Sequence, residues 1–144
     1  MPQLRETDMA LKLVYPTLAM IFWIFVVGVI MFWRRKAAFQ SKAVRFSDVA
    51  ISNERYPEDA RRAAANFSNQ FETPVIFFAL IMLALEVGAT SYIMAVLAWA
   101  YVATRIAHTL VHVGSNDLRV RAPVFAVGVL ILFLMFVGVL LNSI

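Results

Sequence analysis

The feature of the sequence that most restricts its fold is an uncharged run of 21 residues, from Leu13 to Trp33. A helix needs about 20 predominantly apolar residues to cross a hydrocarbon core of ~30 Å, so this run has the length of a membrane span. It ends in Trp33-Arg34-Arg35-Lys36, an interfacial aromatic followed by a basic stop-transfer cluster. A signal peptide has a shorter apolar region that ends at a small-residue cleavage site. The run therefore predicts a helix that stays in the membrane.

Three further apolar runs complete a prediction of four spans, at about residues 13–33, 67–85, 91–113 and 122–144. The short link from Glu86 to Ser91 makes the second and third spans a helical hairpin. Pro74 predicts a bend in the second span, and Pro123 is expected at the start of the fourth, where a missing N–H costs least. With 62% apolar residues, the chain is expected to be an all-α integral membrane protein. Residues 1–144 would form one domain, a four-helix transmembrane bundle.

Lys and Arg are concentrated in the first connection, which has eight of them between Arg34 and Arg62. By the positive-inside rule, the connection 34–66 is cytoplasmic and both termini lie on the non-cytoplasmic side. Pro57, followed by two acidic residues, predicts that the second helix begins near this proline. The formal charge is +4, but no aromatic-studded basic face appears, so no nucleic acid partner is expected. The absence of cysteine excludes disulfides and thiolate chemistry from the chain itself.

Polar residues recur at helical spacing on the two middle spans. At 100° per residue, intervals of three and four place each set along one helix face. The second-span set is Arg62, Asn66, Asn69 and Glu72, and the third-span set is Tyr101, Arg105, His108 and His112.

The hairpin predicts which members of the two sets meet. If it turns midway between Glu86 and Ser91, residues at equal depth have numbers that sum to 177. Glu72 then lies beside Arg105, Asn69 beside His108, and Asn66 beside Val111 and His112. Charged groups inside a membrane normally face the protein interior or a watery cavity, where they find partners. Three interpretations are open: a structural ion pair, a pocket whose arginines hold an anionic ligand beside a lipid-facing opening, and a proton or ion path through Glu72, His108 and His112.

A metal site is not expected. His108 and His112 have the i, i+4 spacing of a helical metal pair, but Thr109 stands where the zincin motif has glutamate.

Two segments of the middle spans resemble the MAPEG family, the membrane-associated proteins in eicosanoid and glutathione metabolism. The run Arg105-Ile-Ala-His-Thr-Leu-Val-His-Val-Gly114, followed by Arg121-Ala-Pro123, looks like the third helix of the family's microsomal prostaglandin E synthase branch. The run Asn69-Gln-Phe-Glu72-Thr73 is similar to the family's second-helix pattern. The longer run from Asn66 to Phe78 resembles a bacterial branch of the family.

The resemblance implies a homotrimer with glutathione as cofactor at each subunit interface, and the expected location is the bacterial inner membrane. Lipophilic small-molecule substrates would enter from among the membrane lipids. The glutathione-contacting positions would be Asn69, Glu72 and Arg105, with His108 beside them. The polar face around them adds further candidate binding residues, namely Arg62, Asn66 and His112.

The chain also departs from the family pattern. Where the family has an arginine close to the second-helix asparagine, this chain has an uncharged residue. Arg62 is therefore the nearest cation on that helix. His112 stands where the synthase branch has a tyrosine. Phe125 and Ala126 stand where that branch has the arginine and serine proposed to activate the thiol of glutathione. No catalytic residue is therefore assigned, although Arg105 or Arg121 could supply a cation and Tyr101 a hydroxyl donor.

These substitutions argue against a prostaglandin isomerase. The leading expectation is a glutathione-dependent transferase or peroxidase that acts on lipophilic electrophiles. The alternatives are a noncatalytic membrane protein that retains the fold and a small proton-coupled transporter.

Overall fold

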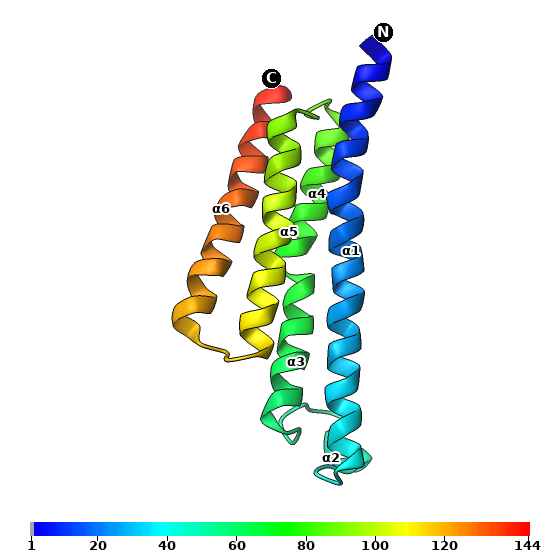
Figure 1. Ribbon diagram of the computed structural model, residues 1–144, viewed down its shortest axis with the longest axis vertical. Helices are drawn as coiled ribbons and strands as arrows, with labels where there is room; N and C mark the ends of the chain where they lie inside the picture. Colours follow the sequence, from blue (N-terminus) through cyan, green and yellow to red (C-terminus); the bar gives the residue numbers. More distant parts are fainter. Residues whose placement is uncertain (1) are drawn as a thin grey trace.

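The computed structural model describes the backbone of residues 2–144 and the side chains of residues 11–144, and the described part is helical without strands. Four segments are long and apolar enough to cross a membrane: Leu11–Gln40, Glu58–Glu86, Tyr92–Val113 and Leu118–Asn142. They run up and down side by side, so that the chain starts and finishes at the same end of the bundle (Figure 1). The predicted four-helix bundle is confirmed. The opposite end carries residues 41–57 and 114–117, and we call it the connection end.

The first helix is longer than the predicted span. Helix α1 covers Pro2–Gln40, because nothing after Trp33 breaks it and Arg34, Arg35 and Lys36 are good helix formers. Its last turns pack against the first connection. The Arg34 Nη1 atom lies 3.2 Å from Asp59 Oδ2, and Arg35 donates to Asn53 Oδ1 at 2.8 Å. The connection contains the short helix α2, Phe46–Val49, and is therefore an ordered part of the fold.

The second span is broken rather than bent. Helix α3 covers Glu58–Ser68, the 3₁₀ turn η1 covers Asn69–Phe71, and helix α4 covers Thr73–Glu86. The start after Pro57 agrees with the prediction. The break follows from Pro74, which disfavours helical backbone just before it and lacks the N–H that a continuous helix would use. Glu72 has φ −98° and ψ −98° at the break, so the regular spacing of the predicted face ends at Asn69.

Helices α5, Tyr92–Val113, and α6, Leu118–Asn142, form the other half of the bundle. Ser91 caps α5 by accepting from the Met94 N–H at 3.2 Å, and Asp117 caps α6 by accepting from the Arg119 N–H at 2.9 Å. This cap places the start of α6 four residues before the predicted span, at Leu118. The expected position of Pro123 at a helix start is therefore wrong, because Pro123 lies inside α6.

The core lies between α1, α4, α5 and α6 and is apolar. Phe77 stacks on Tyr101 with ring centroids 4.8 Å apart, and both side chains are fully buried. Large apolar side chains such as Phe22, Phe25 and Phe133 are instead more than half exposed on the outside of the bundle. A surface this apolar fits a lipid environment better than water.

Candidate functional site

A network of buried polar side chains joins three helices near the connection end. Asn66 on α3 is fully buried, and both polar atoms of its side chain lie 3.4 Å from the hydroxyl of Thr109 on α5. The same hydroxyl accepts from Trp23 Nε1 on α1 at 3.3 Å. Gln70 donates to the Asn66 carbonyl at 3.0 Å. Asn66 therefore holds helices together, and its predicted neighbours Val111 and His112 are replaced by Thr109.

The sequence pattern does not indicate that the network includes Thr109, Gln70 and Trp23, because uncharged residues give a weak signal in an apolar run. The hairpin register offered the only clue, since Asn66 and Thr109 have numbers that sum to 175, close to the expected 177.

Arg105 stabilises the break in the second span. Its Nη2 donates to the Asn69 carbonyl at 3.2 Å, and the side chain is only 2% exposed. That carbonyl would accept from the Thr73 N–H in a continuous helix, so the guanidinium replaces a bond that the break removes. A cation is also favourable at the C-terminal end of a helix.

The predicted pairing of Glu72 with Arg105 is wrong as an ion pair. No carboxylate oxygen of the described residues lies within 4.0 Å of a nitrogen of Arg105, and the Glu72 side chain is exposed. The cause is the break, which turns Glu72 away from the face that a continuous helix would have given it.

Tyr101 is also used within the fold. Its hydroxyl donates to Thr73 Oγ1 at 3.0 Å, in the first turn of α4. The ring is fully buried against Phe77. The suggested role of Tyr101 as a free hydroxyl donor to a ligand has no support in this geometry.

The two histidines lie edge to face, with ring centroids 5.5 Å apart. Asn69 Nδ2 is 3.5 Å from His112 Nδ1, so the asparagine contacts His112 rather than the predicted His108. His108 is 3% exposed, and its Nδ1 is buried without a hydrogen-bond partner. Asn69 and His108 still share one environment, because both line the same cavity.

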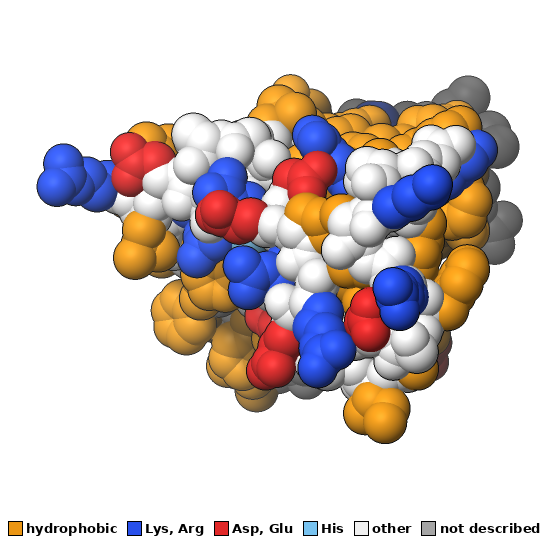
Figure 2. Space-filling view, turned by 90° about the horizontal axis from the view of Figure 1, so that it is seen from below, with side chains coloured by type: hydrophobic (Ala, Val, Ile, Leu, Met, Phe, Trp, Pro, Cys, Tyr) orange, Lys and Arg blue, Asp and Glu red, His pale blue; other side chains and the backbone are white. Residues whose placement is uncertain are grey.

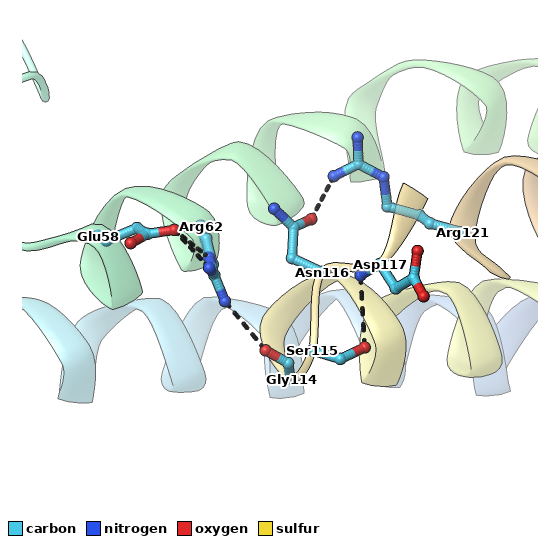
Figure 3. Close-up of polar contacts among 7 residues, drawn as sticks. All are labelled: Glu58, Arg62, Gly114, Ser115, Asn116, Asp117 and Arg121. Carbon is cyan, nitrogen blue, oxygen red and sulfur yellow. Dashed lines mark hydrogen bonds and ion pairs between the residues drawn. The ribbon is translucent and has the colours of Figure 1, made fainter. Parts of the chain in front are cut away.

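This polar cavity has a volume of about 230 Å³ and opens between η1, α5 and the start of α6. Arg121 reaches it from α6 and also donates to Asn116 Oδ1, as Figure 3 shows. Phe125 is an apolar wall whose ring lies 5.8 Å from that of His108. The complete lining is Asn69, His108, Leu118, Arg121, Ala122 and Phe125.

Arg62 lies near the same end of the bundle, on α3. It pairs with Glu58 and donates to the Gly114 carbonyl at 3.1 Å, which ties α3 to the loop between α5 and α6 (Figure 3). Figure 2 looks onto this end and shows Lys and Arg side chains spread over the face with acidic side chains between them. Anions that approach the connection end therefore meet a basic surface.

Several buried polar atoms have no partner in the described part of the chain. They are Gln70 Oε1, Arg105 Nε and His108 Nδ1 in the polar network, and Arg35 Nε in the first connection. Such groups are costly when unpaired, and among their residues only His108 lines the polar cavity. Within residues 11–144, no group of three or more His, Asp or Glu side chains could hold a metal ion. The guanidinium of Arg121 and the amide of Asn69 suit an anionic, hydrogen-bonding organic molecule.

Two larger cavities lie at the other end of the bundle, and neither shares a residue with the polar network. One includes Lys12, Tyr15, Tyr92 and Trp99, and the other is an apolar groove between α1 and α4.

Comparison with known proteins gives one match. The model of the MAPEG family matches residues 13–141, which include nearly all of the four spans and every residue of the polar cavity. No curated protein and no solved structure matches the chain.

Proposed function

Because the chain belongs to the MAPEG family, we propose that it binds glutathione at the polar cavity and acts as a transferase or peroxidase on lipophilic electrophiles. The family and the four apolar helices make it an integral, multi-pass membrane protein. The observation that carries the proposal is a cavity near one membrane surface that combines a cation, an amide and a histidine with unused ring nitrogens.

Glutathione has groups that these side chains can recognise. Its two carboxylates suit guanidinium groups: Arg121 lines the cavity, and Arg62, which pairs with Glu58, lies at the same end of the bundle on another helix. The Asn69 amide can bond to a peptide group. The ammonium group needs an acceptor, for which the Glu72 carboxylate is the candidate at the break.

The exposure of Glu72 supports an assembly of several copies. Helix α4 has 14 residues, or roughly 21 Å at the rise of an α-helix, so Glu72 lies about that far from the termini end of the span. A carboxylate at such a depth costs about 2.5–3.5 kcal/mol on insertion scales unless protein, water or a ligand surrounds it. A neighbouring subunit with glutathione at the interface would provide that environment. The cavity volume, smaller than the ~300–1,000 Å³ of most small-molecule sites, also fits a site completed by a second copy. We propose the homotrimer that the family resemblance implies.

The proposed location is a bacterial inner membrane, with the basic connection end in the cytoplasm and both termini on the other side. Glutathione would then reach the cavity from the cytoplasm, and the electrophile would enter from the lipid. Phe125 and Ala126, at the positions that activate the thiol in the synthase branch, argue against prostaglandin isomerisation.

Glutathione titration of the detergent-purified protein by calorimetry tests the proposal. We expect saturable binding that weakens about 10- to 100-fold in Arg121→Gln, since a hydrogen bond to a charged group contributes roughly 1.5–3 kcal/mol. Glu72→Gln should also weaken it. Arg55→Gln is the matched control, because this arginine lies at the same end but pairs with Asp48 and is largely exposed. Absence of saturation at millimolar glutathione would refute the proposal.

One observation favours a noncatalytic protein that keeps the fold. Arg105, a position expected to contact glutathione, already bonds to the Asn69 carbonyl. That alternative predicts that Arg105 variants disturb assembly while no common electrophile is turned over. The transporter alternative predicts proton-coupled flux in proteoliposomes.

A further inference from the structure

His108 is a buried titratable side chain that the fold does not use. It is 3% exposed, and its Nδ1 has no partner. Its Nε2 makes no hydrogen bond within the described chain and is not enclosed as Nδ1 is, so a ligand in the cavity can reach it. The neighbouring His112 differs, because its Nδ1 contacts Asn69.

The position of His108 within the cavity indicates which part of a ligand it meets. On α5 it lies one turn further from the connection end than His112, and on α6 Phe125 lies one turn further in than Arg121. The deep end of the cavity is therefore formed by an imidazole and a phenyl ring, with centroids 5.8 Å apart. Arg121 lies at the shallow end, where charged carboxylates are desolvated least. An uncharged thiol suits the deep end.

We propose that His108 is the base that removes the thiol proton of glutathione, an inference that rests on the proposed function. The S–H bond breaks and the proton moves to Nε2, which leaves a thiolate beside an imidazolium. The thiolate attacks an electrophilic carbon and forms the S–C bond, while a leaving group such as chloride departs with its electron pair. The imidazolium then releases its proton to water. His108 would thus activate the thiol, which the side chains of Phe125 and Ala126 cannot do.

The charges around His108 bear on its pH dependence. The ionisable groups that act on its ring are Arg105 and His112 on the same helix and Arg121 on α6. The η1 turn presents the uncharged Asn69, and Phe125 adds no charge. The two arginines remain protonated throughout the accessible range, so they also favour the thiolate form of the ligand.

The test separates binding from deprotonation. Ophthalmic acid, which has a methyl group in place of the thiol, reports binding alone, and the ultraviolet absorption of bound glutathione reports the thiolate. In His108→Gln we expect ophthalmic acid to bind within about threefold of the wild type, the thiolate absorption to disappear, and kcat with chlorodinitrobenzene to fall between about 100- and 10,000-fold. Added imidazole should restore part of the activity in His108→Ala. Thr104→Val, one turn away, is the matched control and should behave like the wild type.

The outcomes distinguish the two proposals. If neither glutathione nor ophthalmic acid binds the wild-type protein, the proposed function fails. If both bind but His108→Gln keeps the thiolate absorption and the wild-type pH profile of kcat/KM, only the role of His108 is overturned. If His108→Gln loses binding as well as turnover, and imidazole restores nothing in His108→Ala, the side chain is structural and the inference is likewise overturned.

Discussion

Replacement of Thr109 by valine tests the polar network that joins α1, α3 and α5. The two side chains have nearly the same shape, and both are β-branched, so the change leaves no cavity and alters helix propensity little. It removes a hydroxyl that is 1% exposed, lies 3.4 Å from both polar atoms of Asn66, and accepts from Trp23 Nε1 at 3.3 Å. Hydrogen bonds between membrane helices contribute about 0.6 kcal/mol on average, so three long contacts sum to roughly 2 kcal/mol.

The Asn66 amide sets the upper limit of the effect. It is fully buried, and its side chain has no other hydrogen-bond partner in the described part of the chain. An unsatisfied buried group costs about 1–3 kcal/mol, in the same range as the sum over contacts. We therefore expect Thr109→Val to lower the free energy of unfolding by about 2 kcal/mol, or roughly 30-fold in the unfolding equilibrium.

The measurement is reversible unfolding in mixed detergent micelles or by steric trapping. Thr104→Val is the control, because the Thr104 hydroxyl donates only to the Tyr101 carbonyl of its own helix and should change stability by less than about 0.5 kcal/mol. The double variant Asn66→Leu with Thr109→Val should be less destabilised than the sum of the single variants, since it leaves no unpaired amide. If Thr109→Val is as stable as the control, the network does not hold the helices together and the reasoning is refuted.

Three further predictions concern helix packing and the break. Gly128→Leu should destabilise the bundle by about 1–3 kcal/mol in the same unfolding assay, because a Cβ there meets the Thr104 hydroxyl at 3.0 Å. Gly138→Ala should be tolerated, because a Cβ there meets only the flexible end of a methionine side chain. Pro74→Ala should allow a more continuous second span, which spin-label distances across the break would report as a change; unchanged distances would show that another feature makes the break. Arg105→Lys should keep a cation at the break and retain more thermal stability than Arg105→Met, and equal melting temperatures would contradict the role of the guanidinium.

The sequence predicts the bundle well because length and hydropathy decide it. The four spans, the hairpin between Glu86 and Ser91, and the start of the second helix after Pro57 all follow from local signals. The extra length of α1 and the early start of α6 do not, since a helix can continue through polar residues once it leaves the hydrocarbon region. The cap provided by Asp117 was the local signal that could have placed the start of α6.

The site is less predictable because it depends on contacts between helices, which the residue pattern of a single helix does not show. Pro74 permits either a bend or a break, and the break is stable because Arg105, 31 residues later in the chain, supplies the missing donor. Once the chain breaks, Glu72 turns outward and Tyr101 bonds to Thr73. The prediction that Asn69 and His108 lie together was close, since both line the cavity, yet the direct contact of Asn69 is with His112.

Asn69 connects the break to the cavity. Its carbonyl accepts from Arg105, its amide contacts His112, and the residue also lines the polar cavity. A molecule that binds there and pulls on the amide also pulls on the carbonyl that keeps the span divided. If binding changes these bonds, thermodynamic linkage requires that the geometry of the helix break change the affinity for the ligand by the same coupling free energy. The divided second span and the polar cavity are thus not separate features, because one residue forms part of both.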